Sequence, residues 1–207
     1  MQLWCFSTGD EFDVERYRPT VEAESDGYVQ PFGDSPLDSL NVAENAYMQI
    51  INGATNYVYI TTPYLILDNE MLTTLTRAAK SGIEVIIIMP HIPDKWYAFV
   101  VAKTYYKELI EGGVQIYEYR PGFVHAKVFV SDDDTATVGT INLDYRSLYL
   151  HFECGTFIYN NSEIDRIERD FQHTLTKCHK VTLLEVKNRT ILTKVSGQVL
   201  RLLAPLM

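Results

Sequence analysis

Three residues that could act on a phosphate group lie close together in the middle of the chain. His125, Lys127 and Asp132 form the pattern H-x-K-x4-D within the segment HAKVFVSD. The alternation of apolar and polar residues predicts a β-strand, in which His125 and Lys127 share a face about 7 Å apart at roughly 3.3 Å per residue. A neutral imidazole is a competent nucleophile or proton carrier near neutral pH, and a lysine offers three donors to phosphoryl oxygens. The spacing therefore indicates a site that holds and attacks an oxyanion.

Further polar residues follow at positions that could complete this site. The run TATVGT at 135–140 comes after an acidic turn and is predicted to pair with the first strand as a hairpin, which returns Thr140 and Asn142 toward the level of His125. A hydroxyl and an amide there could donate to a phosphate. Glu153 could accept from the ring N–H of His125 and so select its tautomer. The expected catalytic residues are His125, Lys127, Asn142 and Glu153, and the expected phosphate-binding residues are Lys127, Thr140 and Asn142.

Other residues in the sequence have weaker claims to a chemical role. Asp132 is expected to be structural, because a carboxylate followed by two more aspartates in a turn commonly bonds to nearby backbone N–H groups. His91 lacks a lysine two positions beyond it, so a surface loop with an aromatic edge at Trp96 is favoured over a second catalytic histidine. No metal site is predicted, because the remaining histidines and cysteines match no standard zinc spacing; these are His151, Cys154, His173, Cys178 and His179.

The segments that must position these residues alternate between strands and helices. Apolar strands are predicted at 57–62, 84–90 and 114–119, with helices at 38–52, 69–80 and 94–112. Asp38 or Ser39 is the expected cap of the first helix. This succession predicts parallel strands joined by right-handed crossovers, with ligands at their carboxyl ends. A strand at 154–159 and a helix at 162–177, capped by Ser162, are predicted to follow. The fold class is therefore α/β, a mixed sheet with helices on both faces.

The central residues together resemble a known family signature. His125, Lys127, Asp132, Gly139, Thr140, Asn142 and Glu153 are similar to the HKD motif of the phospholipase D superfamily. The segment GTINLDYRSLYLHFE, with ITTPYL and GFVHAKV upstream, most resembles the second catalytic half of bacterial cardiolipin synthases. The resemblance extends over roughly residues 20–207. Thr140 stands where many relatives have serine, which keeps the hydroxyl. A larger departure is that active sites of the family contain two HKD motifs, whereas this chain has one.

The resemblance implies a phospholipase D-like half-domain in a phosphatidyltransferase. Two phosphatidylglycerol molecules would give cardiolipin through a phosphohistidine, without a metal or another cofactor. The implied partners are phosphatidylglycerol, an anionic membrane surface, and an N-terminal HKD half of the same full-length chain or a second copy. Full synthases also carry N-terminal membrane helices, which would place the protein at the cytoplasmic face of the cell membrane. Because those helices and a first half are missing from this sequence, we expect it to be a fragment that is inactive alone.

Two other functions remain open from the sequence. One is a phosphodiesterase or nuclease of the same superfamily that builds its site from two copies of one chain. The other is a catalytically silent half whose role is to associate with a separate N-terminal half. Residues 1–70 hold twelve acidic residues and two arginines, so extended contacts with nucleic acid are not expected.

Composition and charge divide the chain into three expected parts. The 207 residues carry a net charge of −9, with 46% apolar and 22% charged residues, as in ordinary globular proteins. Residues 1–37 are expected to be an acidic connector or edge segment, in which MQLWCF is a possible strand, and 38–181 the catalytic half-domain. Residues 182–207 form a basic amphipathic tail suited to anionic headgroups. Whether this tail docks on the domain or lies on a membrane is left open by the pattern. The three scattered cysteines are typical of a reducing compartment.

Overall fold

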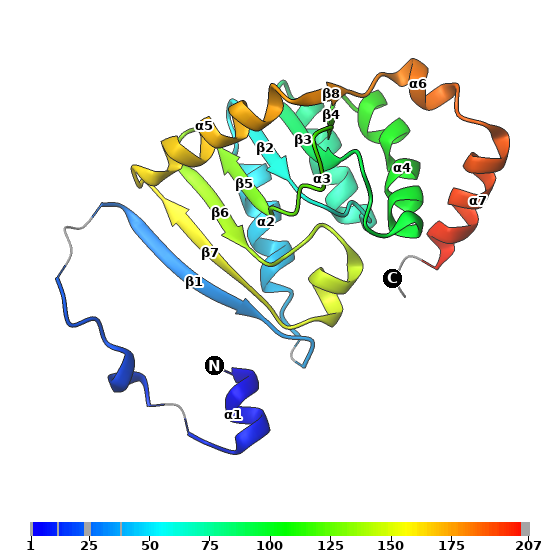
Figure 1. Cartoon of the computed structure of the whole chain (residues 1–207). Coiled ribbons are helices and arrows are strands. Elements are labelled where there is room, and N and C mark those ends of the chain that lie inside the picture. The colour runs from blue at the N-terminus through cyan, green and yellow to red at the C-terminus, as the bar shows by residue number, and fades with distance from the viewer. Residues whose placement is uncertain (1, 12, 23–25, 38, 204–207) are drawn as a thin grey trace.

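The computed structural model describes residues 2–11, 13–22, 26–37 and 39–203. Within these residues, eight strands form one mixed sheet in the order β1-β7-β6-β5-β2-β3-β4-β8 (Figure 1). The strands are β1 (Tyr28–Asp34), β2 (Tyr57–Thr61), β3 (Glu84–Pro90), β4 (Gln115–Tyr119), β5 (Val128–Ser131), β6 (Thr135–Gly139), β7 (Glu153–Tyr159) and β8 (Cys178–Lys180). Strands β2, β3 and β4 are parallel, and the other neighbouring pairs are antiparallel. The predicted α/β class and mixed sheet are confirmed.

Helices cover both faces of the sheet, as predicted. On one face lie α2 (Val42–Gly53), α3 (Asn69–Lys80) and α4 (Trp96–Glu111), which bury the larger apolar core against the central strands. The opposite face is covered by α5 (Glu163–Leu175), whose Ile164 and Phe171 pack against Tyr59 and Val130 (Figure 1). Because β2 and β3 are packed from both sides, nearly every residue in them is buried.

Local sequence signals explain the boundaries of the helices between the parallel strands. Helix α3 begins where the Asp68 carboxylate accepts from the backbone N–H of Met71 at 2.7 Å, and Gly82 follows its end at a φ of +97°. Its bounds agree with the predicted 69–80. Helix α2 begins later than expected, at Val42, because the buried Asp34 of β1 accepts from the N–H of Ala43 at 2.9 Å. The alternative cap Asp38 lies outside the described residues.

Two other local predictions are wrong. MQLWCF was considered as a strand, but its described part forms the start of a helix, α1 (Gln2–Thr8). Among the described residues no strand pairs with this segment, and a helix lets its backbone groups form hydrogen bonds within the segment itself. Ser162 precedes α5 but its side chain does not cap it; the hydroxyl donates instead to the carboxylate of Asp26. Asp26 lies just before β1, whose pairing with β7 brings it to this helix end. The expected edge segment is present as β1, the outermost strand.

The predicted basic tail forms two helices that pack on the domain. These are α6 (Leu183–Lys187), which begins with a capping box between Thr182 and Glu185, and α7 (Ile191–Leu202). Figure 1 shows α7 running alongside α4 at the end of the molecule. Arg201 lies over the ring of Tyr105, with 4.0 Å between the guanidinium carbon and the ring centroid. Among the described residues, no helix is long and apolar enough to cross a membrane.

Candidate active site

The predicted site residues meet at one edge of the sheet. Val128 of β5 pairs with Thr61, the last residue of β2, so the preceding His125 and Lys127 lie at the carboxyl end of the parallel strands. The end of β6 and the start of β7 reach the same edge, where Gly139 pairs with Gly155. This is the edge at which α/β sheets usually bind ligands. The hairpin that returns residues 140–142 toward His125 is confirmed.

His125 and Lys127 differ in their exposure. The strand begins only at Val128, so both residues belong to an extended segment before it rather than to the strand predicted to start at His125. His125 is exposed, with its ring centroid 5.5 Å from that of Phe123. Lys127 is buried, and its ammonium donates to the backbone carbonyl of His125 at 2.7 Å. The pair therefore presents an accessible imidazole beside a partly shielded positive charge.

The electrostatic surroundings keep the histidine ready to act as a base or nucleophile. Partial burial and the charge of Lys127 lower the pKa of His125, although Asp94 opposes them. A lowered pKa leaves the imidazole neutral at neutral pH, which is the reactive form. Burial also lowers the pKa of Lys127, while the carboxylates of Glu153, Asp144 and Asp94 favour its charged form. The lysine thus lies among several acidic groups at this edge.

Glu153 does not support His125, contrary to the prediction. Its carboxylate accepts from the hydroxyl of Thr140 and lies 3.8 Å from Nδ1 of His151. The reason is register: Thr140 N donates to the carbonyl of Cys154 at 2.8 Å, which places Thr140 beside the start of β7. Among the described residues, no hydrogen bond joins Glu153 to His125. Glu153 therefore orients Thr140 and contributes negative charge near Lys127.

A close approach of two strands makes this register possible. A Cβ atom on Gly139 would lie 2.4 Å from the carbonyl oxygen of Cys154, which is too short for any side chain. Glycine therefore lets β6 and β7 approach directly below Thr140. The glycine of the motif is thus explained by backbone packing.

Asn142 belongs to a loop that is tied to the body of the domain. Its Nδ2 donates to the hydroxyl of Ser147 at 2.9 Å, and its Oδ1 is buried without a hydrogen-bond partner among the described residues. The next residue, Leu143, pairs with Leu65 and accepts from the N–H of Ile66 at 2.8 Å. These bonds hold the loop against the segment that follows β2. Its phosphate-binding role, like that of Thr140 and Lys127, stays a prediction.

The structure explains the third residue of the motif directly. Asp132 has a φ of +51° in the β5–β6 turn, and its carboxylate accepts from the backbone N–H groups of Thr55, Asn56 and Tyr57. The last two distances are 3.0 and 2.9 Å. These bonds join the hairpin to the start of β2, at the end of the sheet opposite to His125. These hydrogen bonds agree with the structural role predicted for Asp132, which stays a prediction.

The loop after β3 contributes groups that the sequence pattern did not single out. Asp94 accepts from the hydroxyl of Tyr64 at 2.5 Å and lies near enough to His125 to influence its pKa. The His91 ring pairs with buried Glu118, with 2.8 Å between Nδ1 and Oε2, and Trp96 is exposed. The loop is exposed and leads into α4, which begins at Trp96. The favoured interpretation, a surface loop whose aromatic edge faces lipid, stays a prediction. No short motif marks Asp94; its position after a parallel strand is the signal that could have found it.

The segment LDYRS, whose Asp144, Tyr145 and Arg146 fit a helix start by sequence, follows Asn142. Asp144, after Asn142, accepts from the backbone N–H of Ser147 at 2.7 Å and starts a π-helical turn, Arg146–Leu150. Burial raises the pKa of Asp144. Arg146 donates to Nε2 of His151 at 3.1 Å, which links this turn to the residue beside Glu153. In the described part of the chain, no group of three or more His, Cys, Asp or Glu residues is arranged to hold a metal ion.

Comparison with known proteins identifies relatives of this chain. Residues 47–175 match the family described as "Cardiolipin synthase, PLD-like domain". An uncharacterized protein of Streptococcus mutans is 50% identical over 208 residues, which cover 100% of this chain and 45% of that protein. A cardiolipin synthase of Geobacillus kaustophilus is 34% identical over 209 residues, which cover 100% of this chain and 42% of that enzyme. The chain thus spans less than half the length of these relatives.

Solved structures share the fold at low sequence identity. Phosphatidylserine synthase of Haemophilus influenzae matches with a TM-score of 0.68 at 16% identity, over 86% of this chain and 48% of that one. Nuc of Salmonella typhimurium, a phospholipase D family member, matches with a TM-score of 0.63 at 17% identity, over 74% of this chain and 97% of that one. These two matches show the fold, and the family follows from the sequence matches. The chain belongs to the phospholipase D-like domain family of cardiolipin synthases.

Proposed function

We propose that this chain supplies one His/Lys pair to a phosphatidyltransferase site that makes cardiolipin from two phosphatidylglycerol molecules. The observation that carries the proposal is the exposed imidazole of His125 next to buried Lys127, at the edge of the sheet where the parallel strands end. A second His/Lys pair would come from another phospholipase D-like half. The similarity to cardiolipin synthases supports the choice of substrate.

The reaction needs two displacements at one phosphorus atom. In the first, one histidine attacks the phosphorus of phosphatidylglycerol, a nitrogen–phosphorus bond forms, and glycerol leaves with a proton from the opposite histidine. In the second, the hydroxyl of another phosphatidylglycerol gives its proton to that same group and attacks the phosphohistidine. Cardiolipin forms and the nucleophile is released. His125 takes one of these two roles and its counterpart takes the other.

The phosphoryl oxygens need positive charge and hydrogen-bond donors while the bonds change. Lys127 provides the charge, and Thr140 and Asn142 are the further donors in our proposal. In this structure the hydroxyl of Thr140 donates to Glu153 and the amide of Asn142 donates to Ser147, and the substrate would take over these donors. Donors already in place act most strongly where water is excluded. In our proposal the second half covers this edge, which shields Lys127 and completes the site.

Reconstitution tests the proposed function. The chain is mixed with the part of the Geobacillus synthase that it does not cover, in phosphatidylglycerol vesicles, and cardiolipin and glycerol are measured. We expect turnover in the mixture, little or none with monomeric chain alone, and none when the chain carries His125→Asn. A His179→Asn variant serves as a control, because His179 is in β8, which β2, β3 and β4 separate from β5 in the sheet.

Three results would contradict the proposal. Turnover by strictly monomeric chain would remove the need for a second half. A mixture that associates but stays inactive would make this chain a silent binding half. Cleavage of DNA with strong salt dependence, and no lipid turnover, would instead mark a phosphodiesterase or nuclease.

A further inference from the structure

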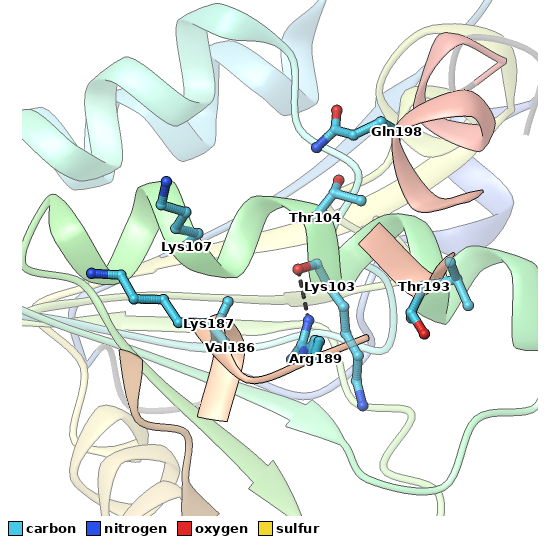
Figure 2. A pocket seen from close by; sticks show the side chains of 9 residues that line it. Lys103, Thr104, Lys107, Val186, Lys187, Arg189, Thr193 and Gln198 are labelled. Carbon is cyan, nitrogen blue, oxygen red and sulfur yellow. Dashed lines mark hydrogen bonds between the residues drawn. The ribbon is translucent and has the colours of Figure 1, made fainter. Parts of the chain in front are cut away.

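A pocket lies between α4, α6 and α7, and it contains none of the residues of the candidate active site. Its volume is about 260 Å³, slightly below the roughly 300–1,000 Å³ of pockets that hold drug-sized ligands. Figure 2 shows the lining residues, which come from the middle of α4, the end of α6 and the loop and helix that follow. A group the size of a lipid headgroup fits such a space better than a larger ligand does.

Cationic side chains dominate the polar part of this pocket. Arg189 donates from Nη1 to the backbone carbonyl of Lys103 at 2.9 Å and lies 5.3 Å from the ring centroid of Tyr106. A guanidinium has five donors, and the hydrogen bonds among the described residues use one of them. Lys107 and Lys187 extend their ammonium groups on the same side of the view in Figure 2. The pocket is thus lined by a half-buried guanidinium and, toward one side, by Lys107 and Lys187.

Acidic residues neutralise only part of this charge. Lys187 lies 3.7 Å from a carboxylate oxygen of Glu111. Lys103 also lines the pocket, but its ammonium pairs with Glu118 at 3.5 Å and contacts the ring of Phe99. Lys107 forms no ion pair with any described residue. In a chain with a net charge of −9, a local excess of cations indicates an anionic ligand.

An apolar ridge lies next to the pocket on the outer side of α7. Val195, Val199 and Leu202 follow the i, i+4, i+7 spacing of one helical face, and Leu202 is 80% exposed. Gln198 lines the pocket and also borders this ridge. Exposed apolar side chains beside a cationic pocket are typical of a surface that meets both the acyl and the phosphate regions of a membrane.

We propose that this pocket binds the phosphate group of an anionic phospholipid while the α7 ridge enters the same leaflet. Arg189 and Lys107 contact the phosphate oxygens, and the ridge contacts the acyl chains next to it. The docking surface is independent of the catalytic residues, because His125 and Lys127 are not part of it. It would hold the protein on the membrane whether or not the active site is complete.

Vesicle binding by the whole 207-residue chain tests the proposal. The vesicles contain equal amounts of phosphatidylglycerol and phosphatidylcholine, and binding is measured by sedimentation at low and high salt. Near an anionic leaflet each Lys or Arg contributes about fivefold in affinity, so Lys107→Gln with Lys187→Gln should weaken binding about 25-fold. Lys80→Gln removes an exposed lysine from α3 and is the matched control, with less than about twofold expected. His125→Asn should bind like the unmodified chain, which separates this surface from the proposed activity.

A second variant and a soluble probe separate a lipid from a free phosphate compound. Val199→Ser should weaken vesicle binding and leave the weak binding of glycerol phosphate, measured by phosphorus NMR, unchanged. The proposal is overturned if Val199→Ser has no effect on vesicles while glycerol phosphate binds tightly. Equal losses in the Lys80→Gln control would show diffuse attraction rather than a pocket, and would overturn it too. If the chain binds no vesicles at any salt concentration, the proposal is also overturned, and the exposed α7 ridge would then be a contact surface for another protein.

Discussion

The ammonium nitrogen of Lys127 lies 2.7 Å from the backbone carbonyl oxygen of His125 and donates a hydrogen bond to it. The lysine therefore holds the backbone of the residue that carries the imidazole. From the sequence, the two side chains were expected to interact only by binding the same phosphate. In the structure the lysine also contacts the backbone of the histidine. Burial of Lys127 strengthens the contact, since a charge-assisted bond counts for more where water is excluded.

Loss of either member of this pair should abolish turnover in the reconstituted enzyme. His125→Asn removes the nucleophile or proton carrier, and Lys127→Ala removes the charge beside it. We expect each to reduce the rate at least about 10²-fold, the scale for losing a positioned acid/base or an oxyanion donor. Thr140→Ser keeps the hydroxyl that donates to Glu153 and should stay within a few-fold of the parent. Chelators should have no effect; activity restored only by added Zn²⁺ or Mg²⁺ would contradict the scheme.

The pKa of His125 can be measured without turnover. Partial burial and Lys127 place it below the ordinary 6.5, and Asp94 pulls in the opposite direction. We expect an NMR titration of the ring protons to show the pKa lower still in Asp94→Asn and higher in Lys127→Met. Asp165→Asn, at an exposed position in the first turn of α5, is the control and should leave the titration in place. A pKa unmoved by both substitutions would show that the two charges do not act on the imidazole.

The pattern of the sequence predicted most of the fold because the signals involved are local. The helix at 69–80 has an aspartate cap before it and a glycine after it, and both act within a few residues. The strands at 57–62 and 84–90 are too apolar to lie at a surface, so their burial between helices follows from composition. Asp132 was expected to bond to backbone N–H groups of its own turn, but its partners, Thr55, Asn56 and Tyr57, come from a distant segment.

The wrong predictions concern partners that come from distant parts of the chain. Ser162 has the residue type of a helix cap, but its hydroxyl bonds to Asp26, which the β1–β7 pairing brings into place. Glu153 has the residue type that supports a histidine, but strand register gives it Thr140 instead. In both cases local chemistry allowed several partners, and tertiary contacts selected one.

Removal of the Asp132 carboxylate should destabilise the fold without touching the chemistry. Burial raises the pKa of Asp132, but hydrogen bonds from the backbone of Tyr57, Thr55 and Asn56 outweigh it and lower that pKa. Bonds to a charged group contribute about 1.5–3 kcal/mol each when both groups are shielded. Because most of this site is exposed and the freed N–H groups can bond to water, Asp132→Ala should lower the free energy of unfolding by about 2–4 kcal/mol, less than the sum of the three bonds. Urea unfolding measures this, with Asp170→Ala at an exposed position of α5 as the control. Full stability of Asp132→Ala with lost activity would instead mark a catalytic role.

A buried acidic pair should make stability depend on pH. Burial and then Asp68 raise the pKa of Glu44 to about 7, and the hydroxyl of Tyr149 bonds to Asp68. Between pH 4.5 and 7 the folded chain then holds a proton that the unfolded chain has lost, so stability falls as pH rises through that window. The loss should be about 2–3 kcal/mol.

Glu44→Gln should remove most of this fall in stability. Urea unfolding at pH 5 and pH 8 would show two nearly equal free energies for the variant. Glu108→Gln, an exposed glutamate of α4, should keep the slope of the parent. If the free energy of unfolding of Glu44→Gln falls with pH as much as that of the parent, the titrating group is not Glu44.

The last prediction concerns how firmly the tail is docked. A Cβ on Gly197 would lie 2.8 Å from Cγ2 of Thr104, so α7 approaches α4 only because position 197 lacks a side chain. We expect Gly197→Ala to lower the melting temperature by several degrees despite the better helix propensity of alanine. Thr104→Ser removes the methyl group in question and should restore most of the loss in the double variant.

Deletion of 188–207 should likewise destabilise the domain, because Arg189 and Arg201 pack on Tyr106 and Tyr105. A stable deletion variant, or Gly197→Ala that stabilises the chain, would show that α7 detaches freely from α4.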